Sequence, residues 1–313
     1  MNNDLPIPRV LRIEPAGACN LRCQHCPTGL IKLKRGIMSD QVIKRITEEA
    51  LKHSNIIDTI VLYHGGEPFL NKNFFTILSG LKKVVSARIK TVSNGMLLDE
   101  PLVTKIVQSG LDEIEISLDG ETEIRNDMVR KNSSGRKVIS SIRQIWEKAR
   151  VYGRTNFKIT VSHVYFGKKK AGGELDLTEP KKAPKWILEG LGPAANDILF
   201  KPHPAMEWPD FKINDELFEV VSVRRHDGFL RECDNIESTI TVRWDGQVVA
   251  CCFDLTSQLV MGNILNQNLE EIWQSIEYGT IREQISQGKP NKTCAQCNQI
   301  SPKQKYLVLK NGN

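Results

Sequence analysis

The feature that most constrains the fold is an alternation of short β-branched runs with helical patterns. Helical spacing fills most of the intervals; residues 39–52, for example, begin at the N-cap candidate Ser39 and repeat apolar residues three or four apart. Repeated βα units predict a parallel α/β sheet or barrel. A closed barrel of the usual kind needs eight strands, so six predict an open barrel. The predicted strands are 10–15, 57–63, 87–93, 111–118, 157–164 and 197–202.

The pattern changes after residue 205. Residues 206–230 are expected to form a linker, and the long basic connection 164–196 a variable loop with one short helix. Residues 238–252 predict two strands around an Asp-Gly turn, and 268–285 predict one amphipathic helix. The expected domains are a barrel over 1–205, a linker over 206–230 and a small β-hairpin-plus-helix unit over 231–313.

Composition and charge argue against several classes of protein. No apolar run approaches the length that spans a bilayer, and the N-terminus has no apolar signal core, so we expect a cytoplasmic protein without a membrane partner. The net charge is +6, and its excess lies in runs expected to be loops, 130–137, 167–170 and 180–185. Solvated surface is the first interpretation of these runs, and an anionic substrate the second. Aromatic residues make up only 6%, which argues against nucleic-acid binding.

Three of the eight cysteines, Cys19, Cys23 and Cys26, lie within eight positions of one another. Prolines and glycines on both sides confine the segment to a loop, which can wrap three thiolates around one metal centre. A structural zinc site needs a fourth ligand, for which His25 lies nearby. An iron–sulfur cluster normally takes four cysteines, so three would leave one iron with an open position that can bind and activate a ligand.

The stretch "CNLRCQHC" resembles the C-x3-C-x2-C signature of the radical S-adenosylmethionine (SAM) superfamily. The resemblance implies that the three cysteines hold a 4Fe–4S cluster whose open iron is chelated by SAM. It further implies reductive cleavage of SAM to a 5′-deoxyadenosyl radical, which abstracts a hydrogen atom from the substrate. The family scaffold is an open (β/α)6 partial TIM barrel, in agreement with the six strands counted above.

Three further motifs resemble the family at the ends of successive predicted strands: "GGEP", "SNG" and "SLDG". The bare glycine backbone of the first would hold the methionine amino group of SAM, and the last would contact its sulfonium end and ribose. His25 matches a position that packs on adenine, and Arg130 a basic residue after the last motif. The cofactor-binding residues implied are His25, Gly65, Gly66, Glu67, Pro68, Ser93, Asn94, Ser117, Asp119 and Arg130.

The other five cysteines lie in the small unit. Spacing alone leaves a four-thiol zinc site and an iron–sulfur cluster equally open. The tail resembles the SPASM/twitch extension of radical SAM enzymes, which implies auxiliary 4Fe–4S clusters, and the absence of cysteines after the last pair favours the single-cluster form. Cys252 is the alternative to Cys251, because neighbours on a strand point to opposite faces. The expected ligands are Cys233, Cys251, Cys294 and Cys297.

The resemblance favours an oxidoreductase that oxidises an alcohol carbon of a sugar- or cyclitol-like molecule, as the twitch-type 2-deoxy-scyllo-inosamine dehydrogenase does. The alternative is a peptide or protein maturase that forms thioethers, epimerises residues or performs formylglycine-type oxidation. Little chain precedes Cys19, so no leader-binding domain is expected in cis. A non-catalytic metal-binding interaction protein is the third hypothesis.

A reducing partner is also implied, namely a flavodoxin- or ferredoxin-like electron donor. Substrate residues are expected where predicted strands end facing the cavity: Tyr63, His163, Lys201 and His203. Alcohol oxidation needs a general base, and His163, Lys201 and His203 are the catalytic candidates.

Overall fold

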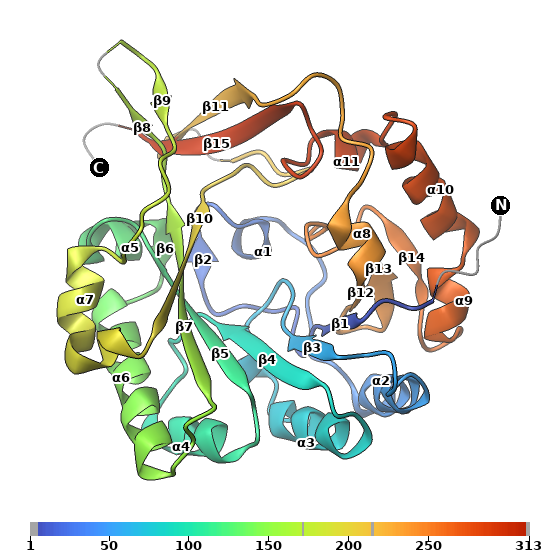
Figure 1. The fold of residues 1–313 in the computed structure, drawn as a ribbon, viewed down its shortest axis with the longest axis horizontal. Helices are drawn as coiled ribbons and strands as arrows, with labels where there is room; N and C mark the ends of the chain where they lie inside the picture. The colour runs from blue at the N-terminus through green and yellow to red at the C-terminus, as the bar shows by residue number, and fades with distance from the viewer. Residues whose placement is uncertain (1–5, 171, 214–215, 311–313) are drawn as a thin grey trace.

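The computed structural model describes residues 6–170, 172–213 and 216–310. Six parallel strands form its centre: β1 (Val10–Ile13), β3 (Thr59–Leu62), β4 (Arg88–Ser93), β5 (Glu113–Asp119), β7 (Lys158–Tyr165) and β10 (Leu199–Pro204). They pair with one another in chain order and curve around an interior that stays open on one side (Figure 1). The predicted open (β/α)6 partial barrel is confirmed.

Helices cover the outer side of these strands (Figure 1). They form where the sequence predicts: Ser39 caps the first long helix by accepting a hydrogen bond from the Val42 N–H, and the buried side chains of that helix include Ile43 and Ile46. The outer helices are α2 (Asp40–Lys52), α3 (Phe74–Val84), α4 (Glu100–Gln108), α6 (Gly135–Val151) and the short α7 (Lys185–Leu191).

The predicted C-terminal hairpin is present as β12 (Thr239–Val242) and β13 (Gln247–Val249), and it is joined by β14 (Val260–Asn263). The first of these strands pairs in parallel with β1, so one nine-stranded sheet runs through both predicted domains. A single apolar core likewise extends from Ile46 and Ile116 in the barrel to Trp273 in the C-terminal unit. The small unit therefore covers the edge strand that an open barrel leaves unpaired.

The segment expected to be a linker contains β11 (Phe218–Arg224), which pairs antiparallel with β15 (Lys303–Leu309). The helix expected over 268–285 is in fact two helices, α9 (Leu269–Trp273) and α10 (Ile276–Ser286). The break has a local cause, since the Ser275 side chain caps the second helix by accepting from the Tyr278 N–H.

The long basic connection 164–196 contains the one short helix expected there, α7, and also a β-hairpin that was not expected. Short elements connect the remaining parts. They are β2 (Arg22–Cys23), α1 (Pro27–Leu30), η1 (Pro68–Leu70), α5 (Glu123–Val129), β6 (Arg130–Lys131), β8 (Lys168–Lys169), β9 (Leu175–Asp176), η2 (Gly192–Asn196), α8 (Asp234–Ser238) and α11 (Lys292–Ala295).

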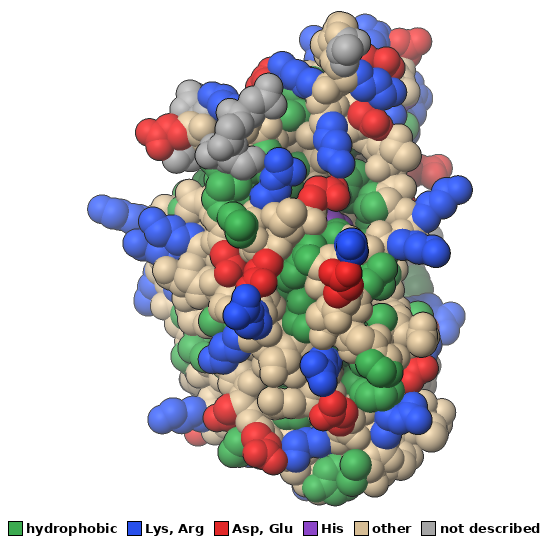
Figure 2. Space-filling view, turned by 90° about the vertical axis from the view of Figure 1, so that its left-hand side faces the viewer, with side chains coloured by type: hydrophobic (Ala, Val, Ile, Leu, Met, Phe, Trp, Pro, Cys, Tyr) green, Lys and Arg blue, Asp and Glu red, His purple; other side chains and the backbone are tan. Residues whose placement is uncertain are grey.

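The surface carries acidic and basic side chains interspersed on the face drawn in Figure 2. Two lysines of the basic run 167–170 are paired: Lys168 lies 3.4 Å from Glu121, and Lys169 lies 2.7 Å from Glu219. Within the described ranges, none of the helices has the length and apolarity that a membrane crossing requires.

Candidate active site and metal centres

A cavity of about 410 Å³ lies at the carboxyl ends of the barrel strands, and the loop of the first three cysteines forms part of its wall. Most of the residues expected to bind the first cluster, SAM or the substrate line this cavity. The exceptions are Pro68, Asp119, His163 and Lys201. Those that do are Cys19, Cys23, His25, Cys26, Tyr63, Gly65, Gly66, Glu67, Ser93, Asn94, Ser117, Arg130 and His203.

The three thiols are held in a loop that β2 and β6 anchor. Cys23 is the register partner of Arg130, so the pairing of these two short strands places a cation beside the thiols. Burial raises the pKa of Cys23 to about 12, although the Arg130 charge opposes this effect. A thiolate at such a position requires a bound cation to compensate its charge, and the iron of a cluster supplies one.

The "GGEP" loop lies directly against the cysteine loop. The Glu67 N–H donates to the Ala18 carbonyl over 2.8 Å. A β-carbon on Gly66 would stand 2.1 Å from the carbonyl oxygen of Ala16 and 2.4 Å from that of Ala18. Only glycine fits this close approach of two backbones.

Glu67 joins the ends of β3 and β4. Its carboxylate accepts from the Ser93 hydroxyl over 2.9 Å and from the Asn94 N–H over 2.8 Å. Burial raises the pKa of Glu67 to about 7, against the effect of these hydrogen bonds. The Asn94 side chain in turn donates to the Asn20 side chain over 2.8 Å, which connects the cysteine loop to the same hydrogen-bond network.

A second buried carboxylate, Glu14, fixes the other side of the loop. It accepts from the Gly65 N–H over 2.9 Å and from the Trp244 N–H over 3.3 Å. Burial alone would raise its pKa, but His64 and Arg243 lower the pKa of Glu14 to about 2. This charged group therefore links the "GGEP" loop to the C-terminal unit.

Asp119 was expected to contact SAM, and the structure instead places it behind the cavity wall. It is fully buried, with Arg130 at 2.9 Å and the His25 Nε2 at 3.4 Å from its Oδ2. Burial opposes the charge of Asp119, but Arg130 and His25 outweigh it and lower the pKa. Asp119 thus positions two residues that do line the cavity.

Two buried polar atoms of the cavity wall lack a hydrogen-bond partner among the described residues. Among the described residues, none hydrogen-bonds to the buried His25 Nδ1 or to the Thr28 hydroxyl. Burial also lowers the pKa of His25, which favours the neutral ring. A flat neutral ring and an orphaned hydroxyl suit an adenosine-bearing ligand beside the cysteines.

A second, smaller cavity brings together the four cysteines expected to hold the auxiliary centre, Cys233, Cys251, Cys294 and Cys297. Cys252 does not line it; its thiol lies 3.5 Å from the Asn235 side-chain oxygen. Within the described ranges, no three Cys, His, Asp or Glu side chains are arranged to ligate a single ion.

The two cavities share a wall made of Phe253 and Gln299. Trp208 lines the first cavity, with its ring centroid 5.4 Å from that of Phe253. Sequence reasoning missed these three residues, together with Glu115 and Met206, which also line the first cavity. Phe253 directly follows the paired cysteines and Gln299 lies two positions after Cys297, and this proximity was the only signal in the sequence.

The substrate candidates fall into two groups. Tyr63 and His203 line the cavity. His163 does not, because its neighbours Ser162 and Val164 occupy the cavity-facing positions of β7. The His163 ring packs against Phe200, and its Nδ1 lies 3.0 Å from the Leu118 carbonyl oxygen.

Lys201 lies 3.3 Å from Glu115 and is partly exposed. Like His163, Lys201 does not line the cavity. The geometry therefore does not support His163 or Lys201 as the general base.

Comparison with known families identifies the fold. Residues 13–169 match the radical SAM superfamily, and residues 233–298 match SPASM, an iron–sulfur cluster-binding domain. The chain belongs to the radical SAM superfamily. A radical SAM enzyme with this iron–sulfur cluster-binding domain binds SAM, a SAM-binding 4Fe–4S cluster and an auxiliary cluster. The chain has a group of cysteines in each of the two matched regions.

Individual relatives of this radical SAM chain differ in activity. GTP 3′,8-cyclase of Clostridium botulinum is 28% identical over 152 residues, which cover 48% of this chain and 46% of that protein. The chain thus matches about half the length of that relative. Mycofactocin maturase MftC of Mycolicibacterium smegmatis is 24% identical over 310 residues, which cover 94% of this chain and 76% of the maturase. BtrN, solved in complex with AdoMet and 2-DOIA, shares the fold with a TM-score of 0.58 and 18% identity over 94% of both chains.

Proposed function

We propose that this radical SAM enzyme is a dehydrogenase that oxidises an alcohol carbon of a sugar- or cyclitol-like small molecule. An alcohol carbon that becomes a ketone loses a hydrogen atom, a proton and an electron. SAM held beside Cys19, Cys23 and Cys26 would supply the acceptor of the hydrogen atom, and an auxiliary cluster held by the C-terminal cysteines would accept the electron. The chain itself must supply the acceptor of the proton.

The observation that carries the proposal is the wall shared by the two cavities. Among the described residues, Phe253 and Gln299 line both cavities. A substrate in the first cavity therefore lies next to the site of the second group of cysteines. Such a neighbour suits a reaction in which the substrate gives up an electron.

His203 is the proton acceptor that the geometry favours. It lines the cavity, and burial followed by the nearby charge of Lys201 lowers its pKa below the ordinary value of 6.5. The imidazole is therefore neutral at pH 7 and competent as a base. Because the base must be neutral, protonation of His203 should lower the activity only when the pH falls below 6.5.

The proposal is tested by incubating the anaerobically reconstituted enzyme with SAM, dithionite and a panel of aminocyclitols and sugars. We expect one ketone per 5′-deoxyadenosine with the right substrate. His203→Gln should lower product formation roughly 100-fold or more at unchanged iron content, and His163→Gln, at a position facing away from the cavity, should lower it less than tenfold. 5′-Deoxyadenosine formed without any oxidised product across the panel would count against a dehydrogenase.

The second candidate is peptide modification, which the coverage of this chain by the mycofactocin maturase favours. It predicts turnover with a peptide and none with free sugars or cyclitols. In either case the reducing partner that we propose is a flavodoxin- or ferredoxin-like protein.

A further inference from the structure

Three cationic side chains project into the barrel interior below the residues that line the cavity. Lys90 shares its face of β4 with Val92, and Lys201 shares its face of β10 with His203; both Val92 and His203 line the cavity. Arg12 of β1 is level with Val61 of β3, which is also the register partner of Lys90. Three separate strands thus direct a cation toward one region, which we call the floor cluster (Arg12, Lys90, Lys201 and the carboxylate Glu115).

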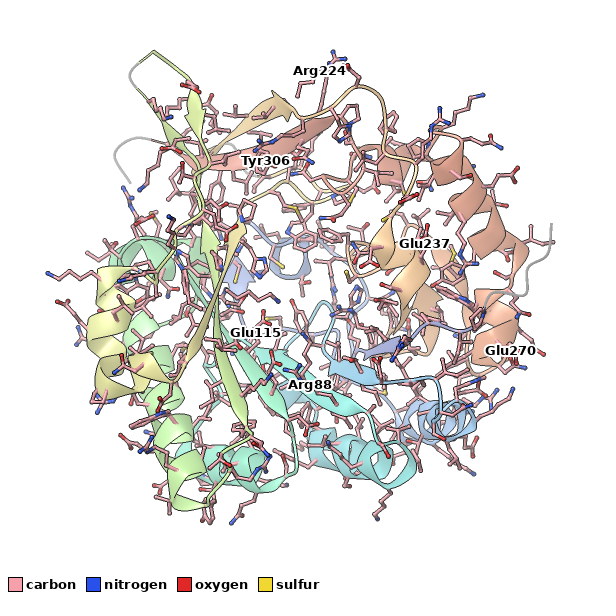
Figure 3. All side chains as sticks on the ribbon, in the orientation of Figure 1. Arg88, Glu115, Arg224, Glu237, Glu270 and Tyr306 are labelled. Carbon is pink, nitrogen blue, oxygen red and sulfur yellow. The ribbon has the colours of Figure 1, made fainter. Side chains whose placement is uncertain are left out.

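The floor cluster carries more positive than negative charge. Glu115 is its only carboxylate and lies 3.3 Å from the Lys201 ammonium; in Figure 3 it lies within the curve of the strands. The neighbouring Arg88 adds nothing to the excess, because it pairs with Glu113. Three cations against one carboxylate leave an excess of two positive charges.

Two of the cations have unused hydrogen-bonding capacity. The guanidinium of Arg12 donates to the Tyr63 carbonyl over 3.4 Å, but its buried Nε has no partner among the described residues. The Lys90 ammonium likewise has no hydrogen bond or ion pair within the described ranges. Burial, followed by the charges of Lys201 and Arg12, lowers the pKa of Lys90, so this clustering of cations is unfavourable without an anion.

We propose that the floor cluster binds a phosphate group of the substrate. A phosphate monoester carries a charge of about −1.5 to −2 at neutral pH, which matches the excess. Arginine binds phosphate oxygens through its planar fork and lysine does so as a point charge. Glu115 of the cluster also lines the cavity, as does His203, so a sugar or cyclitol anchored by its phosphate would present its hydroxyl-bearing carbons to the SAM end.

This inference rests on the proposed function in one respect, that the substrate is a small hydroxylated molecule. It is tested without turnover, by titrating inorganic phosphate into the reconstituted, SAM-loaded enzyme and following saturation by ³¹P NMR. We expect saturable binding of one phosphate per chain. Lys90→Gln and Arg12→Gln should each weaken it at least tenfold, and the matched control Lys83→Gln, exposed on α3 outside the barrel, should stay within twofold.

The outcomes separate the site from the reaction. Non-saturable binding, or the same dissociation constant in the wild type and both floor variants at unchanged iron content, would overturn the proposal. Acetate that bound as tightly as phosphate would overturn the assignment to phosphate. If Arg12→Gln does not fold, Lys90→Gln decides, since its side chain has no structural partner to lose. Saturable phosphate binding without oxidation of any sugar phosphate would retain the site and reject the dehydrogenase.

Discussion

Gly66→Ala tests the close approach of the "GGEP" loop to the cysteine loop. The new methyl group would stand 2.1 Å and 2.4 Å from the carbonyl oxygens of Ala16 and Ala18. Both are backbone atoms, so no rotamer change relieves the clash. Overpacking typically destabilises a protein by about 1–3 kcal/mol. Because the backbone neighbours cannot move aside, we expect Gly66→Ala to cost about 3 kcal/mol of stability or binding free energy.

That energy must appear in one of two measurements. If the loop keeps its place, the melting temperature falls. If the loop moves away from the cysteines, SAM affinity falls, by roughly 100-fold for about 3 kcal/mol because each tenfold change corresponds to about 1.4 kcal/mol. Equilibrium dialysis of SAM against the reconstituted enzyme, together with thermal unfolding, covers both.

Gly80→Ala is the matched control. Gly80 lies inside α3, and a β-carbon there would meet its nearest atom, on Thr47, at 3.8 Å. In a helix interior this substitution should stabilise by about 0.5–1 kcal/mol and leave SAM binding unchanged. A Gly66→Ala enzyme with wild-type SAM affinity and wild-type melting temperature would refute the reasoning.

Three further substitutions test the supports of the two centres. Glu14 has a pKa of about 2 in the folded protein against an ordinary 4.5, so its charge stabilises the fold above about pH 4.5 and this contribution is lost as the pH falls toward 2. Glu14→Gln should lower the free energy of unfolding by about 3 kcal/mol at pH 7. The melting temperatures of the two proteins should converge as the pH falls from 4.5 toward 2. A constant difference in melting temperature across this range would exclude the charge as the cause. Asp119→Asn leaves the buried Arg130 without its anionic partner and should cost about 3–5 kcal/mol, measured by thermal unfolding, whereas an unchanged melting temperature would show that the pair is dispensable. Cys251→Ser should remove about four irons per chain and Cys252→Ser none; the reverse result would assign the ligand to Cys252.

The sequence predicted the features whose causes are local. The six parallel strands are recognisable because β-branched runs alternate with helices that carry their own caps, as Ser39 does. The break before α10 also had a local cause, the cap at Ser275, and could have been predicted. By contrast, β11 pairs with β15 from the far end of the chain, and β12 pairs with β1. No short-range pattern encodes either pairing.

The site divides in the same way. Cysteine spacing and the glycine pair depend on a few consecutive residues, and the structure brings these residues together. Phe253 and Gln299 join the two cavities, and Glu115 reaches the first, through tertiary packing alone. His163 was placed in the cavity because strand ends point there, but alternation along β7 gives that face to Ser162 and Val164. A shift of one residue decides such an assignment.

The central claim is that two iron–sulfur clusters flank one substrate cavity. The most direct test is iron and sulfide per chain after anaerobic reconstitution, compared between the wild type and a variant with alanine at Cys19, Cys23 and Cys26. The account predicts about eight irons in the wild type and about four in the variant. About four irons that fall to near zero, with zinc retained by the C-terminal cysteines, would contradict it and leave the dehydrogenase without an electron acceptor.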